Sequence, residues 1–296
     1  MTIRSIGLRG AFVVNKYYTD NGIEYVASRL SAELGKRGHT LEFTPCPTLI
    51  YDENCSFDFG GGIDYVIFWN KDYMLARALE KAGIKVFNNS RAIEICDDKA
   101  KTYLQLFGSG VKVPRTVVAP VVYDVSEGTD SSFIARVENY LGYPVVVKEN
   151  TGSQGRQVYL AQTRAELISL HASLLRTPHI FQRYEADERG VDIRVYVVGG
   201  KAVACCKRRN TTGFKSNVHM GGRVEKYEAS DALKTEAERI ASVIGLDYGS
   251  VDFLTGETHV FAEANSNAYM FGIEQLGYDI AGPFAEHIVR TVEGRS

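Results

Sequence analysis

The first ninety residues alternate between helical and extended patterns, and this alternation is the strongest constraint on the fold. Apolar residues recur at helical spacing from about Gly22 to Lys36, and a short β-type segment, Thr40 to Phe43, follows. The same order returns in the strand pattern of Asp64 to Trp69, the helix pattern of Lys71 to Lys81 and the strand pattern of Ile84 to Phe87. Strands that alternate with helices predict βαβ units, and therefore a parallel sheet in an N-terminal α/β domain.

The bulk composition argues against several classes of protein. The 296 residues carry a formal net charge of −2, whereas a general nucleic-acid binder normally has a large positive excess. No stretch approaches the roughly 18 apolar residues of a membrane span, and the N-terminus has no signal-peptide pattern. The five cysteines lack CxxC spacing, so we expect neither a disulfide nor a zinc site. We expect a cytoplasmic protein that binds neither nucleic acid nor membranes.

A further helix is expected after the N-terminal strands. Ser90 can cap it, and Asp98 and Lys99 fall inside the segment, which runs to Leu106. Two glycines then end the helix, and an extended segment follows.

Two apolar strand segments near the C-terminus predict a hairpin with three oxygen-bearing side chains on one face. Glu263 and Asn265 stand two residues apart, so both point to the same face of a strand. Gly256 suits the first position of a II′ turn, and in that register Asp252 faces Phe261 with Glu263 as its diagonal neighbour. An all-oxygen set of Asp, Glu and Asn suits magnesium far better than zinc. The alternative is a solvated acidic face, but a carboxylate among such apolar neighbours needs a partner.

A strand that ends at Lys148 is joined by a glycine-bearing loop to a second strand. The loop residues are Gly152, Ser153, Gln154 and Gly155. Small residues let backbone N–H groups approach phosphate oxygens closely, and Lys148 adds a point charge. Because the loop joins strand to strand, it is not a P-loop; we interpret it as a flap over phosphates. The alternative is a plain hairpin with a flexible turn.

A second hairpin is predicted around Gly199 and Gly200, which suit a type I′ turn. In the resulting register Asp192 faces Lys207, and Arg194 lies in the same polar row. This row forms either a cross-strand salt bridge on a wet surface or the floor of an active site.

The segment after this hairpin is basic and contains glycines, which suits an anionic substrate or a γ-phosphate. Its polar residues include Arg208, Arg209, Lys215, Ser216 and Asn217. A solvated charge run is an equally good interpretation for Arg208 and Arg209.

Taken in order, these residues resemble the ATP-grasp superfamily, and within it the RimK-type ligases that join an amino acid to a carboxylate. The resemblance covers roughly Ser90 to Arg290. Its pieces are Asp98-Lys99, Val147-Lys148 with the Gly152 to Gly155 flap, Gln182-Arg183-Tyr184, Asp192-Ile193-Arg194, Lys215 to His219 before Gly221-Gly222, Val251-Asp252, Glu263-Ala264-Asn265 and Gly272-Ile273-Glu274.

The resemblance implies the ATP-grasp fold, in which two α+β subdomains clasp ATP behind an N-terminal parallel α/β domain. The expected divisions are 1–92 for the N-terminal domain, 93–184 for the central subdomain with the flap and 185–296 for the C-terminal subdomain with the metal site.

The resemblance also implies the roles of individual residues. Lys99 and Lys148 would contact phosphates, with the flap residues above them. The backbone around Arg183 and Tyr184, after Gln182, would hold adenine, and Asp192 would lie near the ribose or the substrate. The residues expected to act in catalysis or to line the phosphate side are Arg194, Lys215, Ser216 and Asn217. Asp252, Glu263 and Asn265 would hold one or two Mg²⁺ ions, with Mn²⁺ as an alternative.

The implied activity is that of an ATP-dependent ligase. It would join an amino acid or amine to the carboxylate of an amino acid or peptide through an acyl phosphate, releasing ADP and phosphate. The alternatives are a phosphotransferase to a hydroxyl group and a non-catalytic nucleotide-binding protein, and the chain could form a homo-oligomer. Two departures from the family pattern stand out: Arg183 where an acid is common at the hinge, and Ser266 to Phe271 where many glutamate-adding members have Ser-Pro-Gly.

Overall fold

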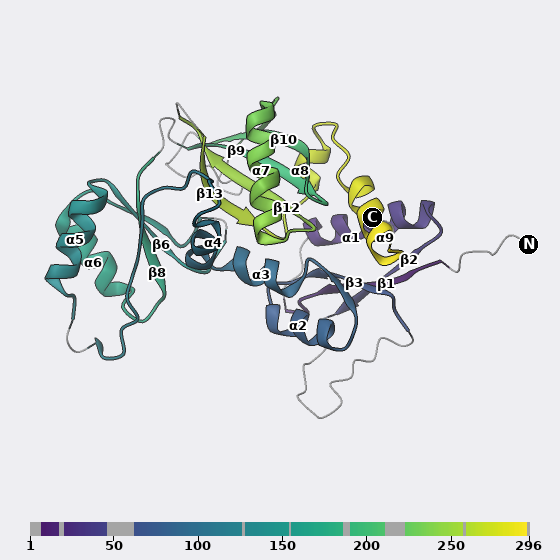
Figure 1. Cartoon of the computed structure of the whole chain (residues 1–296), viewed down its shortest axis with the longest axis horizontal. Coiled ribbons are helices and arrows are strands. Elements are labelled where there is room, and N and C mark those ends of the chain that lie inside the picture. Colours follow the sequence, from purple (N-terminus) through teal and green to yellow (C-terminus); the bar gives the residue numbers. More distant parts are fainter. Residues whose placement is uncertain are drawn as a thin grey trace, which may run out of the picture.

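The computed structural model describes residues 7–17, 21–45, 62–125, 128–153, 155–185, 190–210, 223–256 and 259–294. In these residues the chain forms three β-sheets with helices packed against them (Figure 1). One sheet is parallel and two are antiparallel, which agrees with the predicted combination of α/β and α+β units. Within the described ranges, the helices lack the combination of length and apolar character that a membrane crossing requires.

The N-terminal sheet is parallel, with the strand order β2-β1-β3-β4. Its elements are β1 (Arg9–Val14), α1 (Asn21–Lys36), β2 (Thr40–Pro45), β3 (Tyr65–Trp69), α2 (Tyr73–Lys81) and β4 (Lys85–Phe87). The two helices cover opposite faces because successive strand residues point to opposite sides: Phe12 shares a hydrophobic cluster with Leu30 of α1, and Val13 shares one with Leu79 of α2. The predicted βαβ organisation is confirmed.

The central sheet is antiparallel, with the order β5-β8-β6-β7. Its elements are β5 (Thr116–Val118), α5 (Ser131–Leu141), β6 (Val145–Glu149), β7 (Val158–Ala161), α6 (Arg164–Ser173) and β8 (His179–Arg183). Residues of α5, α6 and the strands share one cluster, which includes Ile134, Val147 and Leu167. Figure 1 places this sheet and its two helices at the left end of the molecule.

The C-terminal sheet has the order β11-β10-β9-β12-β13. Its strands are β9 (Val191–Val198), β10 (Lys201–Arg209), β11 (Arg223–Lys226), β12 (Tyr248–Leu254) and β13 (Val260–Asn265). One face packs against α3 (Ser90–Asp97), α4 (Lys99–Leu106) and α7 (Asp231–Ile244). The inner part of the other face, with Tyr196 and Tyr248, joins the cluster that contains α1, α8 (Phe271–Glu274) and α9 (Ala281–Val292).

The segment expected to be one helix from Ser90 to Leu106 is broken at Asp98. Asp98 has an extended backbone and accepts a hydrogen bond from the Lys101 N–H, so it caps a new helix, α4. The cap of α3 is Asn89 rather than Ser90, because the Asn89 side chain accepts the Ala92 N–H. The break matters for function because it places Lys99 in the first turn of α4, at the edge of a pocket.

The hairpin of β9 and β10 begins in the predicted register, with Val198 opposite the first residue of β10. A β-bulge at Val203 then shifts the remaining pairs by one residue. Arg208 rather than Lys207 therefore lies opposite Asp192, and the predicted pairing is wrong.

A second bulge, at Ala262, changes the register of β12 and β13. Asp252 lies directly opposite Glu263, so the predicted pairing with Phe261 is wrong. Because of the extra residue, Phe261 and Ala264 both pack against the helices of one face, while Glu263 lies on the opposite face with Asp252. Two residues of the predicted turn, 257 in its two-residue loop and 258 after it, lie outside the described residues.

The last helix packs against the first. Helices α1 and α9 lie side by side, and their apolar residues belong to one cluster with β1, β3 and β12 (Figure 1). Polar contacts also join α1 to α8. Arg29 Nε of α1 lies 2.8 Å from Glu274 Oε2 of α8, and the Tyr25 hydroxyl donates to the same oxygen at 2.7 Å. The N-terminal and C-terminal sheets therefore share one continuous core.

Candidate active site

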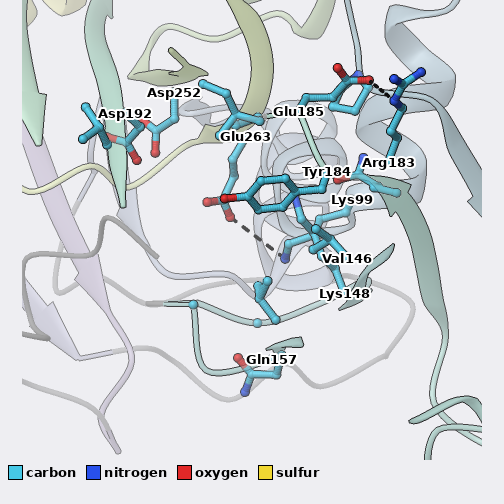
Figure 2. Close-up of a pocket in the computed structure, with 18 of the residues that line it drawn as sticks. Lys99, Val146, Lys148, Gln157, Arg183, Tyr184, Glu185, Asp192, Asp252 and Glu263 are labelled. Atoms are coloured by element: carbon cyan, nitrogen blue, oxygen red, sulfur yellow. Dashed lines mark ion pairs between the residues drawn. The ribbon is translucent and has the colours of Figure 1, made fainter. Parts of the chain in front are cut away.

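A pocket lies where strands of the central sheet meet strands of the C-terminal sheet (Figure 2). It brings together residues from distant parts of the chain, and most of the residues expected from sequence to form a site line it. These are Lys99, Lys148, Gly152, Ser153, Gly155, Gln182, Arg183, Tyr184, Asp192, Asp252 and Glu263. Gln154, Lys215, Ser216 and Asn217 lie outside the described residues, and Arg194 and Asn265 lie in the same sheet next to the lining residues.

Two lysines reach the pocket from different elements. Lys148 lies on β6 and Lys99 in the first turn of α4, and Figure 2 shows both side chains extending toward Glu263. Burial lowers the pKa of Lys148 to about 8, with Lys99 acting in the same direction and Glu263 opposing it. Lys99 Nζ lies 4.0 Å from Glu263 Oε1. The pocket therefore holds a cationic pair next to one carboxylate.

The flap between β6 and β7 depends on its first glycine. Gly152 has φ +134°, a conformation that L side chains rarely adopt, and a Cβ there would lie 2.5 Å from Gln157 Oε1. Gln157 lines the pocket, and its Oε1 is buried without a hydrogen-bond partner. The positive φ favours glycine at this position, and a Cβ there would also force the Gln157 side chain to move.

The hinge between the two antiparallel sheets is formed by the end of β8 and the residues after it. Gln182 is 1% exposed and donates to Thr116 Oγ1 at 2.9 Å, which holds β8 to β5. Arg183 turns to Glu185, at 3.8 Å between Nε and Oε1. Figure 2 shows Tyr184 extending from the hinge into the pocket, and its hydroxyl is buried without a hydrogen-bond partner.

A ladder of alternating charges crosses the C-terminal sheet beside the pocket. In order, its members are Asp192, Arg208, Asp252 and Arg194, from β9, β10, β12 and β9. Arg208 makes two contacts with Asp192, Nε to Oδ1 at 2.7 Å and Nη2 to Oδ2 at 2.5 Å, and its Nη2 also lies 2.7 Å from Asp252 Oδ2. Arg194 donates to both oxygens of Asp252, at 2.8 and 2.7 Å.

The ladder is buried, and its electrostatics follow from that. Burial alone would raise the pKa of Asp252, but Arg194 and Arg208 outweigh it and hold that pKa below its usual value. The same carboxylates raise the pKa of Arg194 and of Arg208 against the effect of burial. Asp252, Arg194 and Arg208 are therefore charged, and each has an oppositely charged side chain beside it.

The position of Arg208 in the wall of the pocket could not be predicted from the sequence. In the sequence, Arg208 belongs to the basic run Lys207-Arg208-Arg209, which is equally typical of a solvated surface. Its position opposite Asp192 depends on the bulge at Val203, which the sequence does not reveal. Glu185 and Gln157 also line the pocket and were not singled out.

The oxygen-bearing side chains on β12 and β13 could hold a divalent cation. Asp252 and Glu263 are cross-strand partners, and Asn265, two residues on, is opposite Ser250. Asn265 Nδ2 and Ser250 Oγ are buried without hydrogen-bond partners. Across the described ranges, no three His, Cys, Asp or Glu side chains cluster as a metal site, so the third donor here is an amide.

This donor set fits Mg²⁺, which prefers oxygen ligands and few carboxylates. The fit carries one condition, because Asp252 already accepts three N–H groups from the two arginines. The Arg208 contact is to Oδ2, which also accepts an N–H from Arg194, so a cation that binds this oxygen competes with a guanidinium group.

Comparison with known proteins gives a consistent result. Residues 96–288 match the model of the RimK-like ATP-grasp domain. The chain is 31% identical over 231 residues to N-acetylaspartylglutamate synthase A of Homo sapiens. The aligned region covers 76% of this chain and 58% of the human protein. It is 30% identical over 287 residues to the probable alpha-L-glutamate ligase of Aliivibrio fischeri (strain MJ11), covering 90% of this chain and 92% of that protein.

Solved structures agree on the fold. The D-alanine–D-alanine ligase of Bacillus anthracis, complexed with ATP, superposes with a TM-score of 0.71 at 17% identity and covers 97% of this chain and 98% of its own. By contrast, the chain spans little more than half the length of several curated relatives that it matches, including the human synthase.

Proposed function

The chain belongs to the RimK-like ATP-grasp family, and from this premise we propose that it is an ATP-dependent ligase that forms an amide bond. In this proposal ATP activates a carboxylate of an amino acid or peptide as an acyl phosphate. The amine of an amino acid then displaces phosphate, and ADP and phosphate leave. The Bacillus anthracis ligase is complexed with ATP, and the structure of the ATP-grasp ligase PsnB contains Mg and ADP; for this chain we propose ATP with one or two Mg²⁺ ions, replaceable by Mn²⁺.

One observation carries the proposal: cationic and oxygen-donor side chains line the same pocket. Lys99, Lys148, Asp252 and Glu263 all line it, and the Glu263 carboxylate lies next to the lysines (Figure 2). Phosphoryl transfer requires positioning and neutralisation of charge more than a protein nucleophile. A pocket with both features suits a triphosphate and its metal ion.

The residues of the chain have distinct tasks in this proposal. Lys148 and Lys99 hold the phosphates, and the flap glycines allow backbone N–H groups to approach them. The hinge around Arg183 and Tyr184 receives the base, and Asp192 lies on the ribose side. Bound Mg²⁺ would neutralise phosphate charge and orient the transferring group, with Asp252, Glu263 and Asn265 as its ligands.

Arg194 lies next to this site and is the proposed stabiliser of the transferring phosphoryl group or of the tetrahedral intermediate. Its guanidinium pairs with Asp252 and is held in a fixed orientation by two hydrogen bonds. Lys215, Ser216 and Asn217 complete the phosphate and substrate side in the same proposal.

Names of the relatives suggest which amine to test first. The proteins from Homo sapiens and Aliivibrio fischeri are named for products or substrates that contain glutamate. This chain has an aromatic segment, Ser266 to Phe271, where many glutamate-adding members have Ser-Pro-Gly. Glutamate is the first amine to test because of the relatives' names, and this departure from the pattern of glutamate-adding members puts other amino acids in the same screen.

The division at residues 92 and 184 is part of the proposal. The three sheets support it because β1 to β4, β5 to β8 and β9 to β13 fall within the three ranges. Helices α3 and α4 connect the units, since they precede the central sheet and pack against the C-terminal sheet.

The test is product analysis. The protein is incubated with ATP, Mg²⁺ and pairs of amines and carboxylates, and nucleotide, phosphate and coupled product are quantified together. We expect one ADP and one phosphate for each amide formed. AMP with pyrophosphate would contradict the proposal, a phosphorylated product without free phosphate would indicate a phosphotransferase, and nucleotide binding without turnover would indicate a non-catalytic protein.

A further inference from the structure

Both oxygens of the Asp252 carboxylate accept hydrogen bonds from arginine side chains. Its Oδ1 accepts one N–H from Arg194, and its Oδ2 accepts one from Arg194 and one from Arg208. The Asp252 side chain is 3% exposed and that of Arg208 is 8% exposed. Water therefore contributes little to screening these contacts, and a cation that binds Oδ2 of Asp252 must displace one of its two N–H donors.

The charges around the pocket oppose a metal ion that arrives alone. Among the described residues, the lining cations Lys99, Lys148 and Arg208 lie near the lining carboxylates Asp192, Asp252 and Glu263. Arg194 adds a fourth positive charge from beside the pocket, where it pairs with Asp252. These seven groups carry four positive charges and three negative charges. The Arg183–Glu185 pair adds one charge of each sign and does not change the balance. A divalent ion added to a buried, already positive site meets repulsion that a triphosphate would remove.

The two arginines differ in how easily each can leave Asp252. Arg194 would break a bidentate pair, whereas Arg208 would break one contact, from Nη2 to Oδ2. Arg208 also keeps its bidentate pair with Asp192, so it stays neutralised if it turns away from Asp252. Arg208 lines the pocket, so its guanidinium can meet an anion that enters there.

We propose that Arg208 is a positioning residue that closes the metal site until a nucleotide arrives. The phosphates draw the Arg208 guanidinium away from Asp252 Oδ2, and this exposes the oxygen to the divalent cation. Metal ion and nucleotide therefore bind synergistically, and metal ion alone binds weakly. This inference rests on the proposed function only in taking the pocket as a nucleotide site.

The test is Mn²⁺ binding, measured by electron paramagnetic resonance with and without a non-hydrolysable ATP analogue. Arg208→Gln removes the competing cation, so we expect it to bind Mn²⁺ without nucleotide about tenfold more tightly than the parent, and to lose most of the enhancement that the analogue gives. A purely structural role predicts the opposite sign, because a disturbed site binds every ligand more weakly.

Arg209→Gln is the matched control, since Arg209 is the next residue on β10 and points to the other face. It should bind Mn²⁺ as the parent does. Arg208→Lys is a second variant that keeps the positive charge and provides a test if the glutamine variant does not fold. A single ammonium group cannot form the bidentate pair with Asp192 and contact Asp252 at the same time. We expect this variant to show a smaller enhancement by the analogue than the parent.

Two results would overturn the inference. One is unchanged or weaker Mn²⁺ binding by folded Arg208→Gln in the absence of nucleotide, and the other is tight Mn²⁺ binding by the parent without nucleotide. Failure of the proposed function looks different, because the parent would then form no amide, while the nucleotide-free Mn²⁺ titration is read without turnover.

Discussion

Glu263 on β13 lies directly opposite Asp252 on β12, and its carboxylate lies 4.0 Å from the ammonium of Lys99. The bulge at Ala262 produces this arrangement, because it rotates Glu263 onto the pocket face while Phe261 and Ala264 stay in the core. The Glu263 carboxylate, a proposed metal ligand, thus lies next to the proposed ligand Asp252 and the proposed phosphate-binding lysines.

Replacing Glu263 by Gln should abolish turnover and leave the fold intact. The substitution keeps the size of the side chain but removes a negative charge from the metal site, and we expect a loss of about a hundredfold or more in kcat. Glu225→Gln, at an exposed position of β11 in the same sheet, is the control. Activity within a few-fold of the parent would remove the metal assignment.

Replacing Lys148 by Met should weaken ATP binding. A buried charge-assisted contact with phosphate contributes about 1.5–3 kcal/mol, which corresponds to a loss of about tenfold or more in affinity. Isothermal titration calorimetry with a non-hydrolysable analogue measures it. Lys101→Met, on α4 and paired with Glu94 outside the pocket, should leave affinity unchanged; equal affinities in parent and Lys148→Met would contradict the assignment.

ATP affinity should also depend on pH through Lys148. Its pKa is lowered to about 8, chiefly by burial, so the side chain is charged below pH 8 and loses its charge as the pH rises past that value. Affinity should therefore fall above about pH 8, by up to about tenfold per pH unit for one proton. Lys148→Met should lack this inflection, and an identical pH profile in both proteins would count against the prediction.

Gly152→Ala should raise the KM for ATP several-fold. A methyl group at φ +134° is strained and lies 2.5 Å from Gln157 Oε1, so the flap or the Gln157 side chain that lines the pocket must shift; backbone strain of this kind costs about 1–3 kcal/mol. Gly35→Ala in α1, where a Cβ meets no atom within 4 Å, is the control and should not change the KM. A parent-like KM for Gly152→Ala would show that the flap does not approach the nucleotide.

Arg29→Ala should destabilise the whole protein. Arg29 pairs with Glu274, whose side chain is 6% exposed, and removal would leave a buried carboxylate without its guanidinium. We expect a loss of about 2 kcal/mol in the free energy of unfolding, measured by urea denaturation. Lys201→Ala removes an exposed ion pair with Glu238 and should cost less than about 1 kcal/mol; a similar loss in both variants would contradict the role of Arg29.

Much of the fold could be predicted because local pattern determines it. The βαβ order of the first ninety residues and the two C-terminal hairpins follow from apolar periodicity and turn residues, and the structure contains them. The break at Asp98 was missed because the helical pattern continues on both sides of the break.

The geometry of the site depended on features that carry no local signature. A β-bulge adds one residue without a characteristic composition, so those at Val203 and Ala262 could not be anticipated, and each changes which side chains meet. Arg208 was therefore not distinguished from a solvated charge run. The packing of α9 on α1 joins residues far apart in the sequence, which periodicity alone does not reveal.

The most direct test of the ligase account follows oxygen atoms. Once a carboxylate substrate is found, it is labelled with ¹⁸O at both carboxylate oxygens, and the phosphate released from ATP in the presence of the amine is analysed by mass spectrometry. An acyl phosphate transfers one carboxylate oxygen to phosphorus, so the account predicts one ¹⁸O atom in each phosphate released. Phosphate without ¹⁸O would show that the carboxylate was never phosphorylated and would contradict the account.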